Sequence, residues 1–102
     1  MARSYGGGVE QQQAIEYVAE CFWPGVREAD LRDMDARAAA SAAETSALGD
    51  GVRYLGSLLM REDEVVLCRF LGSETAVRRA AERAAIPFER ILEAAASPWP
   101  GE

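Results

Sequence analysis

Apolar and polar residues repeat with two different periods along the chain, and the changes of period divide it into elements. Three runs are rich in β-branched and aromatic residues and stop at polar or turn residues, which favours strands: Ile15 to Phe22, Val52 to Met60 and Glu64 to Leu71. Between the first two, Glu28 to Leu48 places apolar or small residues three or four positions apart, the pattern of an amphipathic helix.

A second helix and a last strand complete the series. Ser73 can cap a helix over Thr75 to Ala84, and Pro87 ends it. Glu89 to Ala94 has some helix propensity, yet a fourth strand would close the sheet, so we predict a strand there. The predicted order is therefore β-α-β-β-α-β.

This order is that of the ferredoxin-like α+β fold. Right-handed crossovers put both helices on one face of a four-stranded antiparallel sheet, with the strands in the order fourth, first, third, second. We predict this domain over residues 14–96. A disordered Gly- and Gln-rich N-terminal tail is expected over 1–13 and an extended C-terminal tail over 97–102.

The opposite face of the predicted sheet has no helix to cover it. Strict alternation along the first three strands places seven apolar side chains on this uncovered face: Val18, Phe22, Leu55, Leu59, Val65, Leu67 and Leu71. It places five polar side chains among them: Glu16, Glu20, Arg53, Ser57 and Arg69. This is too much apolar area to leave in water. We therefore predict a dimeric α/β barrel, in which two such sheets face each other and enclose a cavity.

Composition and charge exclude several classes of function. The net charge of −6 argues against binding to nucleic acid or to an anionic membrane. The chain has no histidine, which removes Ser-His-Asp and Cys-His catalysis and any imidazole zinc site. Cys21 and Cys68 are interpreted as buried, reduced thiols. Since no run of residues looks like a membrane span or a signal peptide, a cytoplasmic location is expected.

Three segments resemble a family of small domains of unknown function that includes a nickel-binding protein, within the ferredoxin-like dimeric α/β-barrel group. They are YVAECFWPG, VRYLGSLLMREDEVVLCRF and AAERAAIPFERI, within residues 16–92. Similar proteins usually have glycine where this chain has Ala85. The resemblance implies nickel binding that relies partly on histidine. Without histidine, Glu16, Glu20 and Glu64 remain as candidate ligands of a divalent metal, with Cys68 as a soft one.

Three hypotheses about function stay open. The leading one is a homodimeric small-ligand-binding domain without a cofactor. In it Glu20 and Arg69 orient the ligand, Ser57 and Arg53 assist, and the cavity is lined by Val18, Phe22, Leu55, Leu59 and Leu67. The second is a divalent-metal binder using Glu16, Glu20 and Glu64.

The third hypothesis is a cofactor-free enzyme of the dimeric α/β-barrel type: an isomerase, a cyclase or an oxygenase. Glu20 would then be the general acid or base, and Arg69 would stabilise developing negative charge. The alternative, which the residue types favour, is that Glu20 and Arg69 form a plain ion pair at the dimer interface.

Overall fold

A computed structural model describes residues 15–95 and 97. In chain order its elements are β1 (Ile15–Phe22), α2 (Glu28–Ala47), β2 (Val52–Met60), β3 (Val65–Gly72), α3 (Glu74–Arg83) and β4 (Arg90–Ala94). The predicted order is confirmed, including a strand rather than a helix at the end. The tails predicted over residues 1–13 and 97–102 lie, except for Ser97, outside the described residues.

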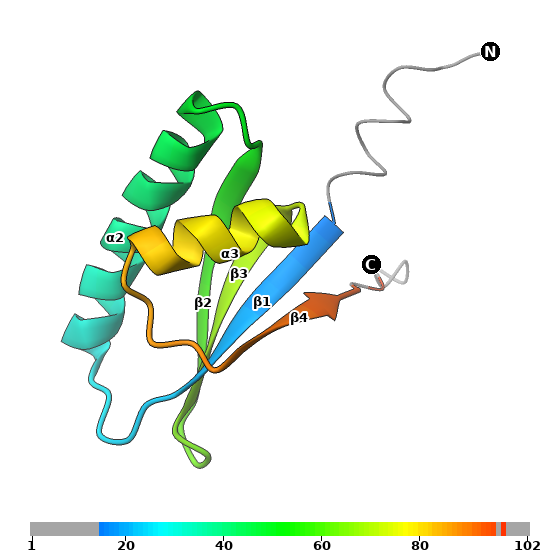
Figure 1. The fold of residues 1–102 in the computed structure, drawn as a ribbon. Helices are drawn as coiled ribbons and strands as arrows, with labels where there is room; N and C mark the ends of the chain where they lie inside the picture. Colours follow the sequence, from blue (N-terminus) through cyan, green and yellow to red (C-terminus); the bar gives the residue numbers. More distant parts are fainter. Residues whose placement is uncertain (1–14, 96, 98–102) are drawn as a thin grey trace, which may run out of the picture.

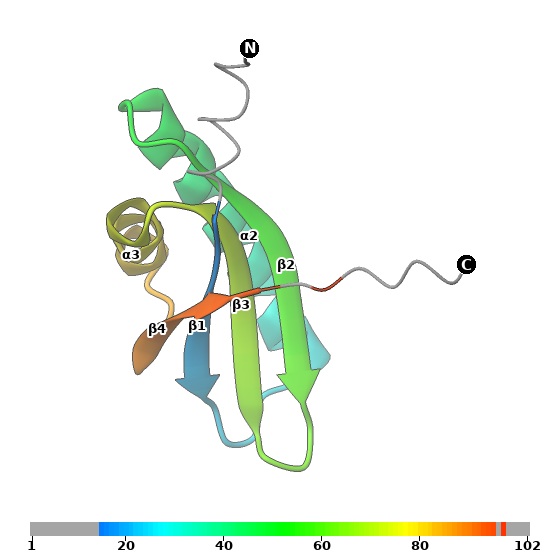
Figure 2. The same ribbon diagram turned by 90° about the vertical axis from the view of Figure 1, so that its right-hand side faces the viewer.

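The four strands form one antiparallel sheet in the order β2-β3-β1-β4. Both helices lie on the same face of this sheet (Figure 1). The opposite face carries no helix, and in Figure 2 none lies between the viewer and the strands β1, β2 and β3. The ferredoxin-like arrangement predicted from the sequence is therefore confirmed for the described residues.

The helices cover the sheet through small side chains. Ser73 caps the N-terminus of α3, and its Oγ accepts a hydrogen bond of 3.1 Å from the backbone N–H of Ala76. Its buried side chains are those of Ala76, Val77, Ala80 and Ala81, which let the helix approach the sheet closely.

Among the described residues no helix is long and apolar enough to cross a membrane.

The hydrophobic core fills the space between the helices and the sheet. Its largest fully buried side chains include Phe70, Met34, Val66 and Val77. The alternation predicted for the first and third strands is confirmed, because Ala19 and Cys21 of β1 and Val66, Cys68 and Phe70 of β3 are all 0 % exposed. One face of the sheet is therefore dry.

The second strand departs from strict alternation because it contains a β-bulge. Tyr54 pairs with Phe70, but the next residue of β3, Arg69, pairs with Gly56, so Leu55 is an extra residue without a partner. Gly56 has a φ of 118°, a backbone conformation that residues other than glycine rarely adopt. The bulge inverts the alternation over the rest of the strand.

This inversion corrects two predicted positions. Ser57 pairs with Cys68 and Leu59 pairs with Val66, so both lie on the helix-covered side of the sheet. Leu59 accordingly packs against the core. The prediction that they line the uncovered face is wrong, and Leu58 and Met60 take their places there.

Candidate functional site

Alternate residues of all four strands form the uncovered face. The strand register arranges them in four rows, running from the β2–β3 hairpin to the other end: Met60-Val65-Phe22, Leu58-Leu67-Glu20-Arg90, Gly56-Arg69-Val18-Leu92 and Arg53-Leu71-Glu16-Ala94. The face therefore has an apolar end at the hairpin and an ionic end opposite. Of the predicted apolar lining, Val18 and Leu67 lie here, while Leu55 is the bulge residue.

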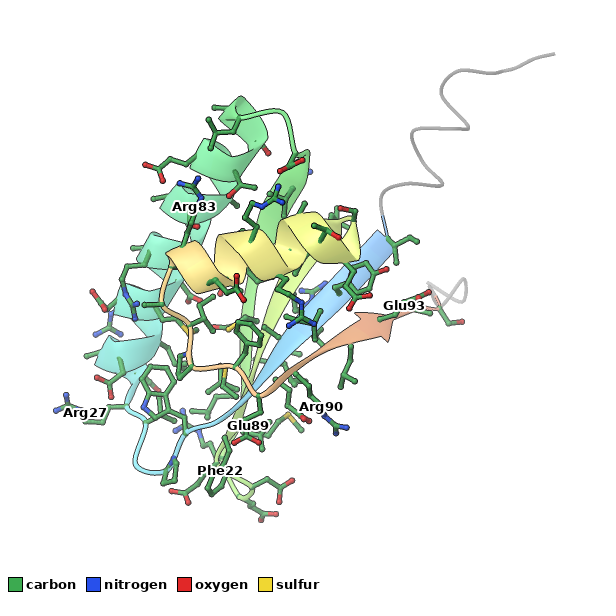
Figure 3. The ribbon with its side chains drawn as sticks, in the orientation of Figure 1. Phe22, Arg27, Arg83, Glu89, Arg90 and Glu93 are labelled. Atoms are coloured by element: carbon green, nitrogen blue, oxygen red, sulfur yellow. The ribbon has the colours of Figure 1, made fainter. Side chains whose placement is uncertain are left out.

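The apolar end holds three large side chains that remain in contact with solvent. Phe22 is 54 % exposed, Leu58 is 51 % exposed and Met60 is 46 % exposed. Phe22 lies near the β2–β3 hairpin and points away from α3 (Figure 3). Phe22 and Met60 lie on either side of Val65, and Leu58 lies in the next row beside Leu67. An apolar patch of this kind usually marks an interaction surface.

The ionic end and the β4 edge contain two ion pairs. Arg69 Nε lies 2.8 Å from Glu16 Oε2, and Arg90 Nε lies 2.5 Å from Glu20 Oε1. The hydrogen bond to Glu16 raises the pKa of Arg69, and the one to Glu20 raises the pKa of Arg90. Both arginines thus hold their charge, and both carboxylates have a guanidinium partner.

The predicted contact between Glu20 and Arg69 is wrong. Arg69 lies directly opposite Val18, so Glu16 and Glu20 are both its diagonal neighbours. Glu20 lies directly opposite Arg90 on the other side, which is the shorter reach. Arg69 therefore forms its ion pair with Glu16.

Arg90 is the functional candidate that sequence reasoning missed. Its side chain lies beside β4, on the side away from α3 (Figure 3). Once the last segment is taken as a strand antiparallel to β1, the pairing of residue 90 with residue 20 decides its face. The sequence could have predicted this position of Arg90, but only if the pairing register of β4 with β1 were known to within one residue.

Arg53 differs from the other two arginines of this face. It is exposed, lies opposite Leu71, and forms no ion pair with any residue that the structure describes. The face carries three arginines, Arg53, Arg69 and Arg90, against two glutamates, Glu16 and Glu20. It therefore has a surplus of one positive charge on a chain whose net charge is −6.

Gly56 leaves room beside this surplus charge. It faces Arg69 across the strand pair, and a Cβ atom added there would meet no heavy atom within 4 Å. The surface above Gly56 is therefore open, with Arg53 and Arg69 on the neighbouring positions of the same face. Such open space beside two guanidinium groups leaves room for one small polar group of a ligand.

The three carboxylates proposed as metal ligands do not come together in one chain. Glu64 directly precedes β3, at the end where Val65 pairs with Phe22. Glu16 lies six residues from Phe22 along β1, about 20 Å away at strand spacing. Among residues 15–95 and 97, no group of three or more His, Cys, Asp or Glu side chains could hold a metal ion. The prediction of a site built from Glu16, Glu20 and Glu64 of one chain is wrong.

Glu64 forms hydrogen bonds that stabilise a turn. Its side-chain Oε2 accepts a hydrogen bond of 3.0 Å from Gly25 N–H, and its carbonyl accepts one of 2.8 Å from Trp23 N–H. These two bonds fix the Trp23-Pro24-Gly25 turn against the start of β3. Glu64 therefore stabilises the loop that leads into α2.

Fold and surface together define a ferredoxin-like α+β domain with one open, partly apolar sheet face. A family model described as "Nickel responsive protein SCO4226-like" matches residues 17–94. The chain belongs to this SCO4226-like family. No curated protein sequence matches it.

A solved structure supports the fold. The crystal structure of SCO4226 from Streptomyces coelicolor A3(2) superposes with a TM-score of 0.66 at 19 % sequence identity. The match covers 81 % of this chain and 99 % of that one. At this identity the likeness establishes the shared fold.

The family description raises the question of nickel, which the described side chains do not fit. The chain has no histidine, and imidazole is the nitrogen ligand that nickel commonly takes in proteins. The carboxylates of Glu16 and Glu20 are each paired with an arginine. We derive no chemistry through nickel at this face.

Proposed function

We propose that the protein is a homodimeric small-ligand-binding domain, with the ligand held between two uncovered sheet faces. The observation that carries this proposal is the apolar end of the face, where Phe22, Leu58 and Met60 are about half exposed. A second copy of the same face would remove these side chains from water. Membership of a family whose member SCO4226 has the same fold is consistent with it.

The size of the face is sufficient for such a dimer. The strands contain 8, 9, 8 and 5 residues. At about 16 Å² of sheet per residue, each face covers about 500 Å². Two faces then bury about 1,000 Å², which is where specific interfaces begin. Side chains that interdigitate add to this projected area.

The distribution of charge fits a particular arrangement of the dimer. The apolar end supplies the contact, because its burial is favourable without partners. The rows that contain the ion pairs border the cavity. In the pairs Arg69–Glu16 and Arg90–Glu20 each charged group already has an oppositely charged partner, so it needs none from the second chain. A ligand can then lie against Val18 and Leu67 and reach the open space above Gly56.

The unpaired Arg53 indicates the class of ligand. A guanidinium binds a carboxylate through two parallel hydrogen bonds, and a partly dry cavity strengthens that interaction. Apolar side chains line the adjacent rows. We therefore expect a small molecule with an apolar body and one carboxylate.

A matched pair of probes tests this expectation. Hexanoate should raise the thermal unfolding midpoint of the dimer, whereas hexanol, its neutral analogue, should raise it less. Arg53→Gln should abolish the difference between the two probes. Arg32→Gln, at an exposed position of α2, should leave the difference unchanged.

Equal responses to both probes in the wild type would contradict the role of Arg53. The enzyme hypothesis with Glu20 as general acid or base stays a prediction. This role requires the Glu20 carboxylate to be released from its ion pair with Arg90. If Glu20→Gln abolishes turnover of a substrate, Arg90→Gln should therefore raise turnover of the same substrate.

A further inference from the structure

A small hollow lies between the β2–β3 hairpin and the loop that joins β1 to α2. Its volume is about 90 Å³, and it is lined by Val26, Leu59, Arg61 and Glu64. Val26 belongs to the loop, Leu59 to the end of β2, and Arg61 and Glu64 to the hairpin turn. Because Leu59 lies on the helix-covered side of the sheet, the hollow is separate from the ligand cavity proposed above.

The lining of the hollow is half apolar and half charged. Val26 and Leu59 are partly buried and pack against the hydrophobic core, so they form a fixed apolar floor. Arg61 and Glu64 carry opposite charges at its rim. A hollow of this composition can hold a molecule that has both an apolar part and charged groups.

The two charged side chains leave the backbone from neighbouring points of one turn. The Glu64 N–H donates a hydrogen bond of 3.3 Å to the Arg61 carbonyl, which closes the turn. Glu64 has a φ of 55°, a left-handed conformation that is uncommon for residues other than glycine. The Glu64 side chain is held in place by the hydrogen bond of 3.0 Å that its Oε2 accepts from Gly25 N–H. The carboxylate is therefore positioned before any ligand arrives.

Arg61 and Glu64 do not neutralise each other. Among the ion pairs of the described residues, that of Arg61 is with Glu28, and Arg61 Nη2 lies 2.9 Å from Glu28 Oε2. This contact uses one of the five N–H donors of the guanidinium. The Oε1 atom of Glu64 forms no hydrogen bond within the part of the chain that the structure describes. Each rim residue thus retains capacity for one more charged partner.

We propose that this hollow binds a small α-amino acid in its zwitterionic form. The carboxylate of the ligand lies on Arg61, its ammonium group lies on Glu64, and its side chain contacts Val26 and Leu59. One zwitterion brings a partner for each rim residue and adds no net charge to a partly apolar site. The site lies within one chain, so it does not depend on the proposed dimer.

The volume limits the size of the amino acid. Pockets for drug-sized ligands measure about 300–1,000 Å³, several times the 90 Å³ found here. The hollow therefore suits an amino acid about as large as glycine or alanine. A simple carboxylate or a simple amine of the same size would pair with one rim residue and leave the other without a partner.

An NMR titration of the full-length, ¹⁵N-labelled chain with alanine tests the proposal. The amide resonance of Gly25 is the reporter, because this N–H donates to the Glu64 carboxylate. We expect a saturable shift with a dissociation constant of about 1 mM or tighter. A site-specific reporter is needed because solutes that are excluded from protein surfaces raise the thermal midpoint without binding.

Matched probes and variants separate the two charged contacts. Propionate lacks the ammonium group and alaninamide lacks the carboxylate, so each should bind at least about tenfold more weakly than alanine. Glu64→Gln retains an oxygen that can accept from Gly25 N–H, so the turn should persist while alanine binding weakens at least about tenfold. Arg61→Gln should weaken it similarly. Glu82→Gln, at an exposed position of α3, should leave it unchanged.

Three results would overturn the proposal. One is the lack of a saturable shift of the Gly25 resonance up to about 20 mM alanine, far above the expected dissociation constant. Another is equal binding of alanine and either probe. The third is unchanged alanine binding by Glu64→Gln.

Discussion

The two faces of the sheet are built from the same strands and differ in almost every physical property. The covered face consists of residues that are 0 % exposed, such as Ala19, Cys68 and Phe70, under two helices. The uncovered face has half-exposed apolar side chains at one end and two ion pairs towards the other. The covered face is complete within one chain, whereas the uncovered face, on our account, is complete only when a second chain covers it.

Two phenylalanines make this difference measurable. Phe70 is 0 % exposed in the core, and Phe22 is 54 % exposed on the uncovered face. Phe70→Ala should lower the free energy of unfolding by about 3–5 kcal/mol at any protein concentration, because it leaves a cavity. Chemical denaturation over a range of protein concentrations measures this.

Phe22→Ala is the matched control in that experiment. Its effect should be small at concentrations where the wild type is monomeric and should grow with concentration, since it weakens only association. An effect of Phe22→Ala that is large and independent of concentration would mean that this side chain acts within one chain.

Two exposed leucines test which surface is the interface. Leu58 is 51 % exposed on the uncovered face, and Leu48 is 68 % exposed at the end of α2. Leu58→Arg should weaken dimerisation by about a hundredfold or more, because it puts a charge into an apolar contact. Leu48→Arg should have no effect. Sedimentation velocity compares them, and a monomeric Leu48→Arg beside a dimeric Leu58→Arg would place the interface elsewhere.

The sequence predicted the secondary structure well and the uncovered face less well. The strands begin and end within a residue or so of their predicted positions, because periodicity and turn residues are local. The faces of Ser57 and Leu59 were wrong, because one bulge residue, Leu55, inverts the alternation. A glycine within a strand, here Gly56, is a known sign of a bulge, but it does not specify the shift in register. The pairing of Glu20 with Arg90 likewise depends on register.

Two backbone positions with positive φ should respond in opposite directions. Gly56 has φ 118° and Ala85 has φ 57°. Gly56→Ala should cost about 1–2 kcal/mol of stability through strain, although space is open there. Ala85→Gly should stabilise by up to about 1 kcal/mol, because glycine suits the residue after a helix. Thermal unfolding measures both, and stabilisation by Gly56→Ala would contradict the bulge.

Tyr54 should produce a pH dependence that belongs to the covered face. Burial, followed by the 2.5 Å hydrogen bond to Asp35, raises the pKa of its hydroxyl. As pH rises, the Tyr54 hydroxyl therefore loses its proton at a lower pH in the unfolded state than in the folded state. The associated stability is fully present below the unfolded pKa of about 10 and is lost as pH rises above it.

Tyr54→Phe should lower stability by about 1–2 kcal/mol at neutral pH, through loss of the bond to a carboxylate. It should also flatten the decline of stability above about pH 10. Urea denaturation at pH 7 to 11 measures both effects. An unchanged alkaline slope would show that Tyr54 is not its source.

The most direct measurement is sedimentation equilibrium of the wild-type protein from submicromolar to about 100 µM, since weak specific complexes dissociate in the micromolar range. The account predicts a reversible monomer–dimer equilibrium with the dimer dominant at the upper end and no larger species, because one two-fold contact uses up the whole uncovered face. A chain that stays at the mass of 11.1 kDa throughout would contradict it.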